Sequence, residues 1–453
     1  MHKSLPRLLA TLTLLALPLA AQQEEPVLAG PDAELERQLA PLKAEAEKGD
    51  AHATQQVYMR YGVAGHIEQA RAWSARFNSI LAQQAEAGDT RAMQLLAARY
   101  MAGNDYTPQD LEKAVTWYSR AAEAGEAAAA YILGDVFARQ GNEPMARKAF
   151  EQAYSLYSAR TAAGTDHEAL YCLGYMEQNG IGIPRNTATG IAKLVQAADM
   201  GSPWATAQLF KTYLEGIGAP RDEAKAISYA RKAADEHRDG TMAYVAATAY
   251  LMGKGVEQDI ALGERYLDQA AALSIPDAIY MKANRLENAG KLAEALPFYR
   301  QAASMHQREA LTRYGALLLH GAEGVDPDEP TAISLLNTAA SRYDSPQAAW
   351  ELSRYYATAD ETELADSWCC VAADRGVAQA MARRGLLHLI PGSCVDWSPT
   401  QAYRWWRLGK QAGDSTCTLY IRLFLYLFIP CILIIAFGLP LYLRKRLERR
   451  SAQ

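Results

Sequence analysis

The stretch Tyr175–Asn186, YMEQNGIGIPRN, decides the fold of this chain. Its two glycines flank an isoleucine and form either a loop that binds phosphate or a turn between two helices. Related stretches follow in the sequence: EGIGAPRD (215–222), MGKGVEQD (252–259) and the longer HGAEGVDPDE (320–329). A dinucleotide-binding loop follows a strand and carries a third glycine, and neither feature is present. The recurrence predicts a turn in which the first glycine ends one helix and Asp or Asn begins the next.

A second recurring element is a short tag that ends near a glycine, as in AEAGD (85–89) and AEAGE (122–126). The tag glycines at positions 49, 88, 125, 164 and 201 lie 37 to 39 residues apart, and those at 376 and 413 are again 37 apart. In the residues before the tag, such as LEKAVTWYSRAA (111–122), small and aromatic side chains recur at i, i+3, i+4 and i+7, which is one face of a helix. We count about ten repeats of two helices each.

The turn pattern GxG(V/I/A)xx(D/N) and the second-helix pattern KA(V/I)xWYxxAAxxG resemble the Sel1-like repeat family, which is related to the tetratricopeptide repeat. The resemblance covers about residues 34–413. It implies an all-α solenoid over residues 22–416, in which stacked helix pairs bury apolar faces that a single pair leaves open. The repeats that contain LGDVFARQGNEPMARKAFEQAY (133–154) and NRLENAGKLAEALPFYRQAA (284–303) depart from the pattern, because they have the shorter turn of ordinary tetratricopeptide repeats.

The N-terminus has the composition of a secretory signal peptide over residues 1–21. Lys3 and Arg7 form a short basic region, Leu8 to Leu19 form an apolar run, and Ala20 and Ala21 supply small residues at a cleavage site. We therefore predict export of the chain out of the cytoplasm.

The C-terminus predicts a transmembrane helix over residues 417–443 and a basic cytoplasmic tail over residues 444–453. Leu423 to Leu443 carries no charge, and a helix of that length covers roughly 30 Å, the thickness of a hydrocarbon core. Arg444, Lys445 and Arg446 follow directly, as the cytoplasmic flank of a membrane helix does. We expect a single-pass protein of the inner membrane, with its repeats in the periplasm.

The charge of the exported part excludes one class of partner. Without the predicted signal peptide, anchor and tail, the chain keeps 38 basic and 50 acidic residues, a net charge near −12. Such a surface repels phosphate backbones and offers no basic stripe, so we expect no nucleic-acid partner.

The residues that could carry chemistry are few. In an oxidising compartment, either Cys369 or Cys370 can pair with Cys394, which closes a loop of about 25 residues. The eight histidines show no metal-ligand spacing, and no nucleophile elbow or Walker sequence occurs. We expect no enzymatic activity, no metal and no cofactor, and no single binding residue stands out.

The resemblance implies an adaptor for protein complexes, and some relatives of this kind serve exopolysaccharide secretion. A periplasmic scaffold with protein partners in an envelope assembly is therefore the expected function. One alternative is binding of a glycan or of peptidoglycan, which requires aromatic side chains along the groove. Another is an adaptor for degradation in the endoplasmic reticulum. The absence of any Asn-x-Ser/Thr acceptor argues against that second alternative, because a long luminal domain usually carries some.

Overall fold

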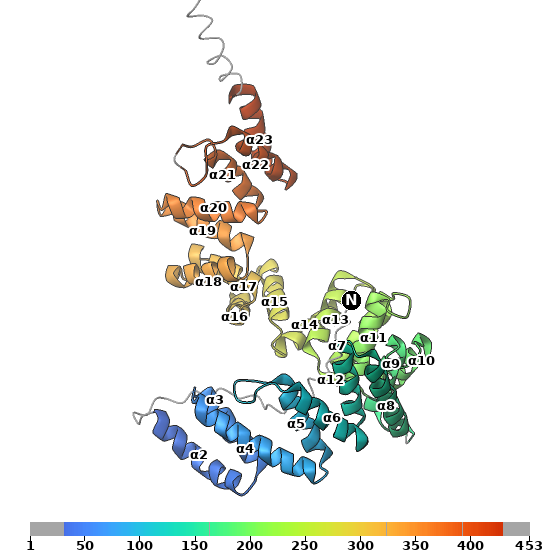
Figure 1. Cartoon of the computed structure of the whole chain (residues 1–453). Coiled ribbons are helices and arrows are strands. Elements are labelled where there is room, and N and C mark those ends of the chain that lie inside the picture. The colour runs from blue at the N-terminus through green and yellow to red at the C-terminus, as the bar shows by residue number, and fades with distance from the viewer. Residues whose placement is uncertain (1–30, 163, 323, 392, 429–453) are drawn as a thin grey trace, which may run out of the picture. The chain divides into compact units, whose positions relative to one another are not determined.

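The structure is a computed structural model that describes residues 31–428, apart from 163, 323 and 392 (Figure 1). The described residues form twenty-two α-helices, α2 to α23, and no strand, with two isolated bridges inside turns. Helices α3 to α22 make ten consecutive pairs, so the predicted all-α repeat fold with about ten repeats is confirmed. The predicted signal peptide (1–21), residues 429–443 of the predicted membrane helix and the tail (444–453) lie outside the described residues.

The chain divides into an N-terminal half, Met1–Tyr229, and a C-terminal half, Ala230–Gln453, and the division falls within α12. From α2 to α11, each helix contacts the next one along the chain (Figure 1). The helices up to the division are α2 (Pro31–Glu47), α3 (Ala51–Val63), α4 (Ile67–Glu86), α5 (Thr90–Ala102), α6 (Leu111–Glu123), α7 (Ala127–Arg139), α8 (Glu143–Thr161), α9 (His167–Asn179), α10 (Thr187–Asp199), α11 (Pro203–Glu215) and α12 (Glu223–His237).

In the C-terminal half, each helix from α13 to α23 likewise contacts the next one. These helices are α13 (Gly240–Met252), α14 (Ile260–Ala272), α15 (Pro276–Asn288), α16 (Leu292–Ser304), α17 (Arg308–His320), α18 (Glu329–Arg342), α19 (Pro346–Thr358), α20 (Thr362–Asp374), α21 (Ala378–Leu387), α22 (Pro399–Gln411) and α23 (Ser415–Leu423). The odd-numbered helices from α3 to α21 are the first helices of the repeats, and the even-numbered ones are the second helices.

The opening stretch forms the predicted turn. Gly180 ends α9 in the left-handed conformation at φ +69°, and Gly182 follows at φ +71°. Asn186 then caps α10 by accepting the N–H of Thr189 at 3.2 Å. The same geometry recurs after α11 and α13, where Gly216 and Gly253 end the first helix. The interpretation of this motif as a connection between helices is therefore correct.

The described repeats have two kinds of turn. Six repeats carry a long turn, after α5, α9, α11, α13, α17 and α21. Four carry a turn of three residues, after α3, α7, α15 and α19. The sequence singled out the turns after α7 and α15, and the structure adds the other two.

The core consists of alanines at the helix contacts and a few large side chains. Tyr118, Tyr266 and Tyr299 are fully buried on second helices. Helices α9 and α10 approach each other closely, since a Cβ on Gly190 would lie 2.5 Å from the amide nitrogen of Gln178. A methyl group cannot fit there, so glycine sets the distance between these two helices.

The C-terminal end of the described chain contains the start of the predicted membrane segment. Helix α23 and a short π-helical segment, η2 (Phe424–Phe428), follow the last pair. Cys417 of α23 is fully buried, and Phe424 packs against Trp406 of α22 with ring centroids 5.6 Å apart. Within residues 31–428, no helix combines the length and the apolar character needed to cross a membrane.

Candidate functional site

A surface cleft that holds several charged and polar side chains lies on three first helices of the C-terminal half. We call it the first-helix cleft; its volume is about 530 Å³. It is lined by Tyr280 of α15, by Arg308, Glu309, Thr312, Arg313 and Ala316 of α17, and by Ser345, Pro346, Gln347 and Glu351 at the start of α19. Two arginines and two glutamates therefore share one cleft with polar and small side chains.

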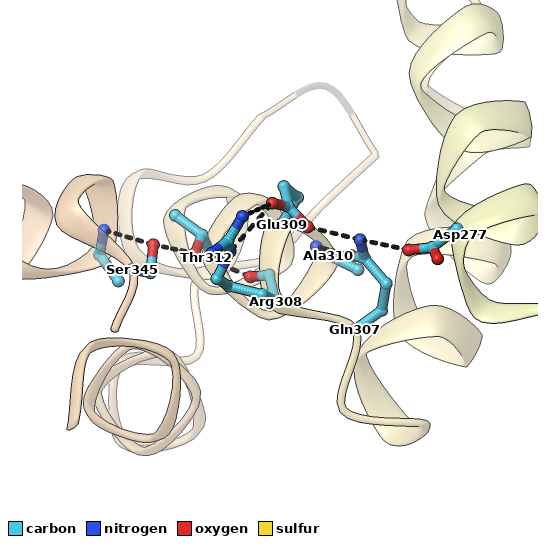
Figure 2. A network of polar contacts seen from close by, with 8 residues as sticks. Asp277, Gln307, Arg308, Glu309, Ala310, Thr312 and Ser345 are labelled. Atoms are coloured by element: carbon cyan, nitrogen blue, oxygen red, sulfur yellow. Dashed lines mark hydrogen bonds and ion pairs between the residues drawn. The ribbon is translucent and has the colours of Figure 1, made fainter. Parts of the chain in front are cut away.

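One end of the cleft is organised by Gln307, the buried residue that caps α17 (Figure 2). Its Oε1 accepts the N–H of Ala310 at 2.6 Å, and its Nε2 donates to Asp277 of α15 at 3.2 Å. The same Nε2 donates to Glu309 at 2.5 Å. One amide side chain thus caps its own helix, reaches the neighbouring first helix and fixes a carboxylate of the cleft.

Glu309 is held in its charged form. Burial opposes its ionisation, but Arg308 donates from Nε at 2.9 Å and from Nη2 at 2.6 Å, and the pKa of the carboxyl stays below its usual range. Arg308 itself is exposed, so the pair presents both a positive and a negative group to solvent. A charged partner can therefore meet either sign at this place.

The other end of the cleft is a buried hydroxyl pair that links α17 to α19 (Figure 2). The Oγ1 of Thr312 and the Oγ of Ser345 lie 2.9 Å apart, and the Ser345 oxygen also accepts the N–H of Ala348 at 3.2 Å. The Thr312 hydroxyl also donates to the carbonyl of Arg308 at 2.9 Å. Because buried hydroxyls need such partners, the two helices are fixed at this distance.

A second ionic group extends the charged surface along α15 and α17. Arg313 forms an ion pair with Glu287, and Tyr299 donates its hydroxyl to the same carboxylate at 2.6 Å. The hydrogen bond from Arg313 is the main reason that the pKa of Glu287 lies below its usual range, with Tyr299 adding to it against the opposing effect of burial. The same carboxylate raises the pKa of Tyr299 further, above the value that burial alone would give.

Glu287→Gln is expected to lower the free energy of unfolding by about 1 kcal/mol at pH 7, since a charged hydrogen bond is lost at a partly exposed site. A depressed carboxyl pKa adds stability that is fully present above the unfolded-state pKa and is lost as the pH falls through the folded-state pKa. The melting temperatures of wild type and variant should therefore converge between pH 5 and pH 3. Melting curves of both proteins, followed by circular dichroism at pH 7 and pH 3, test this. A difference in melting temperature that is the same at both pH values would contradict it.

The chemistry available in the cleft is recognition by charge and hydrogen bonds. Arg308 and Arg313 offer forked donors, and Glu309 and Glu351 offer carboxylates. Within the described part of the chain, no group of three His, Cys, Asp or Glu side chains is placed to hold a metal ion. The arrangement suits a polypeptide, whose side chains and backbone carry both signs and both kinds of hydrogen-bonding group.

The predicted cysteines lie near one another at the other end of the C-terminal half. The Sγ atoms of Cys370 and Cys394 are 3.5 Å apart, as free thiols. Cys369 is fully buried, and its Sγ lies 3.5 Å from the carbonyl oxygen of Ala380. A disulfide with Cys394 remains a prediction, and this geometry favours Cys370 over Cys369 as the partner. The predicted membrane flank, Arg444, Lys445 and Arg446, lies outside the described residues.

The first-helix cleft could not be recognised in the sequence, although one signal of it is present. Gln307 and Ser345 stand 38 residues apart, each directly before the first helix of a repeat. Equivalent positions in consecutive repeats lie side by side, so the polar residues that follow them had to meet. The charged residues of the cleft look like ordinary surface residues in the sequence, because the sequence does not show which of them lie side by side.

A family model described as the Sel1 repeat matches six stretches of the chain: residues 90–126, 167–202, 205–237, 241–274, 308–344 and 378–414. These stretches correspond to the six helix pairs with long turns. The four short-turn pairs lie outside the matched stretches, so the two kinds of turn seen in the structure separate the repeats in the same way.

Two curated relatives match part of the chain. Chitin synthase regulatory factor 3 of Schizosaccharomyces pombe is 26% identical over 273 residues, which cover 56% of this chain and 29% of that protein. An uncharacterized protein of Neisseria meningitidis serogroup B is 28% identical over 202 residues, which cover 44% of this chain and 41% of that protein. The matched region thus spans less than half the length of either relative.

Among solved structures, a protective antigen present in uropathogenic Escherichia coli strains, described as displaying an SLR fold, is similar over 86% of this chain and 82% of its own. The TM-score is 0.57 and the sequence identity is 27%. The repeat architecture is therefore shared over nearly the whole described length.

Proposed function

We propose, from the premise that the chain is a Sel1-repeat protein, that it is a membrane-anchored scaffold whose first-helix cleft binds a protein partner. Sel1 and tetratricopeptide-like repeats typically bind proteins, and members of the Sel1 family are generally non-enzymatic scaffolds. The observation that carries the proposal is the cleft itself, in which two arginines and two glutamates surround small and polar side chains.

The composition of the cleft supports a protein partner over a glycan. Glycan binding requires aromatic faces on which sugar rings stack, and among the described residues only Tyr280 lines this cleft with an aromatic ring. Arginine, in contrast, is enriched at the centres of protein interfaces. Glycan or peptidoglycan binding is therefore the second candidate function, and the endoplasmic-reticulum adaptor is the third.

The cleft is tested by photo-crosslinking. We expect a photoreactive amino acid at Gln347, an exposed residue of the cleft, to give a discrete crosslinked product in membranes of the native cell. The same group at Gln301, exposed on the second helix α16, is the matched control and should give none. Arg308→Glu should lower the yield from Gln347 several-fold, because it reverses a charge of the cleft. Equal products from both positions would contradict the proposal.

The proposal also includes the cellular location of the protein. The apolar N-terminal run, the uncharged C-terminal run and its basic flank support a single-pass inner-membrane protein with its repeats in the periplasm. An envelope assembly, such as one for exopolysaccharide secretion, is the setting that the repeat family suggests.

An alkaline phosphatase reporter tests this topology. A fusion after Gly413 is expected to be active and a fusion after Arg450 inactive, because the enzyme folds only outside the cytoplasm. Activity of both fusions would show that the C-terminus does not return to the cytoplasm, and the reverse pattern would place the repeats in the cytoplasm.

A further inference from the structure

Four times in the described chain, a short-turn repeat is followed by a long-turn repeat. We call the place where a short-turn repeat meets the following long-turn repeat a junction. Two junctions, both in the N-terminal half, can be compared position by position. Helices α3 and α4 correspond to α7 and α8 with an offset of 76 residues, so Gly62 matches Ala138 and Ala70 matches Ala146. The first junction shows what side chain this place accepts.

In the first junction, Tyr106 of the turn after α5 fills the space. Its ring lies over Gly62, where a Cβ would come within 2.4 Å of the tyrosine hydroxyl. The ring centroid is 6.2 Å from that of Tyr58, and the side chain packs against the buried cluster that includes Ala70. Arg71 of the second helix donates to the carbonyl of Asp105, next to the tyrosine, at 3.4 Å.

In the second junction, glycine replaces this tyrosine. Tyr106 stands four residues before the helix cap Asp110, and Gly182 stands four residues before the helix cap Asn186. A Cβ on Gly182 would lie 2.4 Å from the Cβ of Phe150, so no side chain fits at this point of the turn. The space that corresponds to the site of Tyr106 is left as an open cavity.

This junction cavity has a volume of about 620 Å³, within the range of ligand pockets in proteins. Its lining residues include Tyr131, Ala138, Ala146, Phe150, Tyr175 and Gly182. The rings of Tyr131 and Phe150 meet edge to face at 5.3 Å, which leaves aromatic surface toward the cavity. Ala138 stands where Gly62 lies under the ring of Tyr106 in the first junction, and Ala146 matches Ala70 of the cluster against which Tyr106 packs.

The rim of the cavity is acidic. Asp135, Glu143 and Glu151 line it, against the single base Arg147. Asp135 is paired with Arg139 at 2.7 Å, whereas Glu143 and Glu151 are exposed and form no ion pair with another described residue. A basic group next to the entering side chain would therefore be attracted to two unpaired carboxylates.

We propose that the junction cavity binds the tyrosine side chain of a partner protein, in a segment whose neighbouring residues are basic. The chain's own Tyr106 supplies the precedent for the aromatic side chain, and the two unpaired glutamates supply the preference for basic neighbours. The cavity lies in the N-terminal half and shares no residue with the first-helix cleft, so this inference goes beyond the proposed function and does not depend on it.

The test uses the full-length chain in nanodiscs and the blocked peptide Gly-Lys-Gly-Tyr-Gly-Lys-Gly. Saturation-transfer difference NMR at millimolar peptide should show transfer to the tyrosine ring, and affinity for the peptide with Ala in place of Tyr should be at least tenfold lower. Ala138→Trp fills the cavity with an indole and should lower the affinity for the tyrosine peptide at least fivefold. Ala102→Trp, at an exposed alanine of α5, is the matched control and should bind as wild type does.

Charge and ligand class are tested with the same readout. Glu151→Lys should weaken binding several-fold, and replacing both peptide lysines by glutamate should do the same. Unchanged melting temperatures will show that the variants fold. Equal binding to wild type and Ala138→Trp, or no transfer to the tyrosine ring at all, would falsify the proposal. Transfer to chitotriose instead of the peptide would overturn it in favour of a glycan site.

Discussion

Trp406→Ala is expected to lower the free energy of unfolding of the last helix pair by about 3–5 kcal/mol, the range measured for deleting a buried aromatic side chain. Trp406 is 2% exposed and is among the largest fully buried side chains of the described chain. Its indole N–H donates to the carbonyl of Ala382 at 3.1 Å, and its ring lies against Gly385, where a Cβ would come within 2.2 Å of Nε1. Removal of the ring leaves a cavity and removes this hydrogen bond.

The loss of stability in the Trp406 variant should be confined to the C-terminal end of the described chain. Repeats are stabilised by contacts with their neighbours, so the pair α21–α22 and helix α23 should open without the rest of the C-terminal half. Amide hydrogen exchange is the measurement, and protection should fall in residues 378–423 while α13–α18 keep theirs. Trp397→Ala is the matched control, because that indole lies on the turn before α22 and is 56% exposed. It should change stability by less than about 0.5 kcal/mol.

Much of the fold could be predicted because most repeats need a residue with left-handed backbone at the same place, the end of a helix. Gly180, Gly216 and Gly253 end their helices with left-handed backbone, where a side chain is disfavoured, so glycine marks the place in the sequence. Where the glycine tag fades, the backbone still has a positive φ. Ser274, His306 and Asp344 take the left-handed conformation at φ +59°, +61° and +52°. The spacing thus survives the loss of its most visible residue.

Only two of the four short turns were predicted, and for the turn after α19 the loss of glycine is the reason. The turn after α7 contains Gly141 and the turn after α15 contains Gly290, and both were recognised by the length of the segment between two apolar patterns. The turn after α19 has Asp360 at φ +61°, so no glycine marks it. Without that mark, the boundary between two helices is set by packing, which a single sequence does not display.

The candidate sites could not be predicted, because they depend on the way repeats meet. The Thr312–Ser345 pair joins residues 33 positions apart, and its two hydroxyls look like ordinary turn and helix residues in the sequence. The junction cavity depends on the difference between Tyr106 and Gly182, which has meaning only once the two turns are superposed. Repeat spacing predicts which residues are neighbours, but it does not predict which of them leave a space.

The chain is also expected to form one disulfide, between Cys370 and Cys394, when it is exported through its N-terminal segment. The two Sγ atoms are 3.5 Å apart, so little movement is needed, and a disulfide-donating oxidant of the periplasm would take up the two electrons and two protons that the thiols release. The cysteines are 24 positions apart, and a loop of that length corresponds to a stabilisation of about 3 kcal/mol.

The two thiols have different roles in forming this bond. Burial, followed by the contact with Cys394, raises the pKa of the Cys370 thiol to about 12, so its thiolate is scarce at neutral pH. Cys394 is exposed on the turn and is therefore expected to react first with the oxidant, after which Cys370 resolves the mixed disulfide. Burial also raises the pKa of Cys369 to about 12, and its sulfur has no exposed surface, so it should remain reduced.

Alkylation of free thiols followed by mass spectrometry of the unreduced chain distinguishes these outcomes. In the exported chain, Cys369 should be alkylated only after unfolding, while Cys370 and Cys394 should be protected until a reductant is added. Cys369→Ser should leave the bridge intact, and Cys394→Ser should free Cys370 and lower the melting temperature of the last repeats. A chain without residues 1–21 should stay in the reducing cytoplasm and form no bridge. If both thiols stay free in the exported chain as well, either the predicted pairing or the predicted oxidising location is wrong. The activity of a phosphatase fused after Gly413 distinguishes these two explanations, because it reports the location independently of the cysteines.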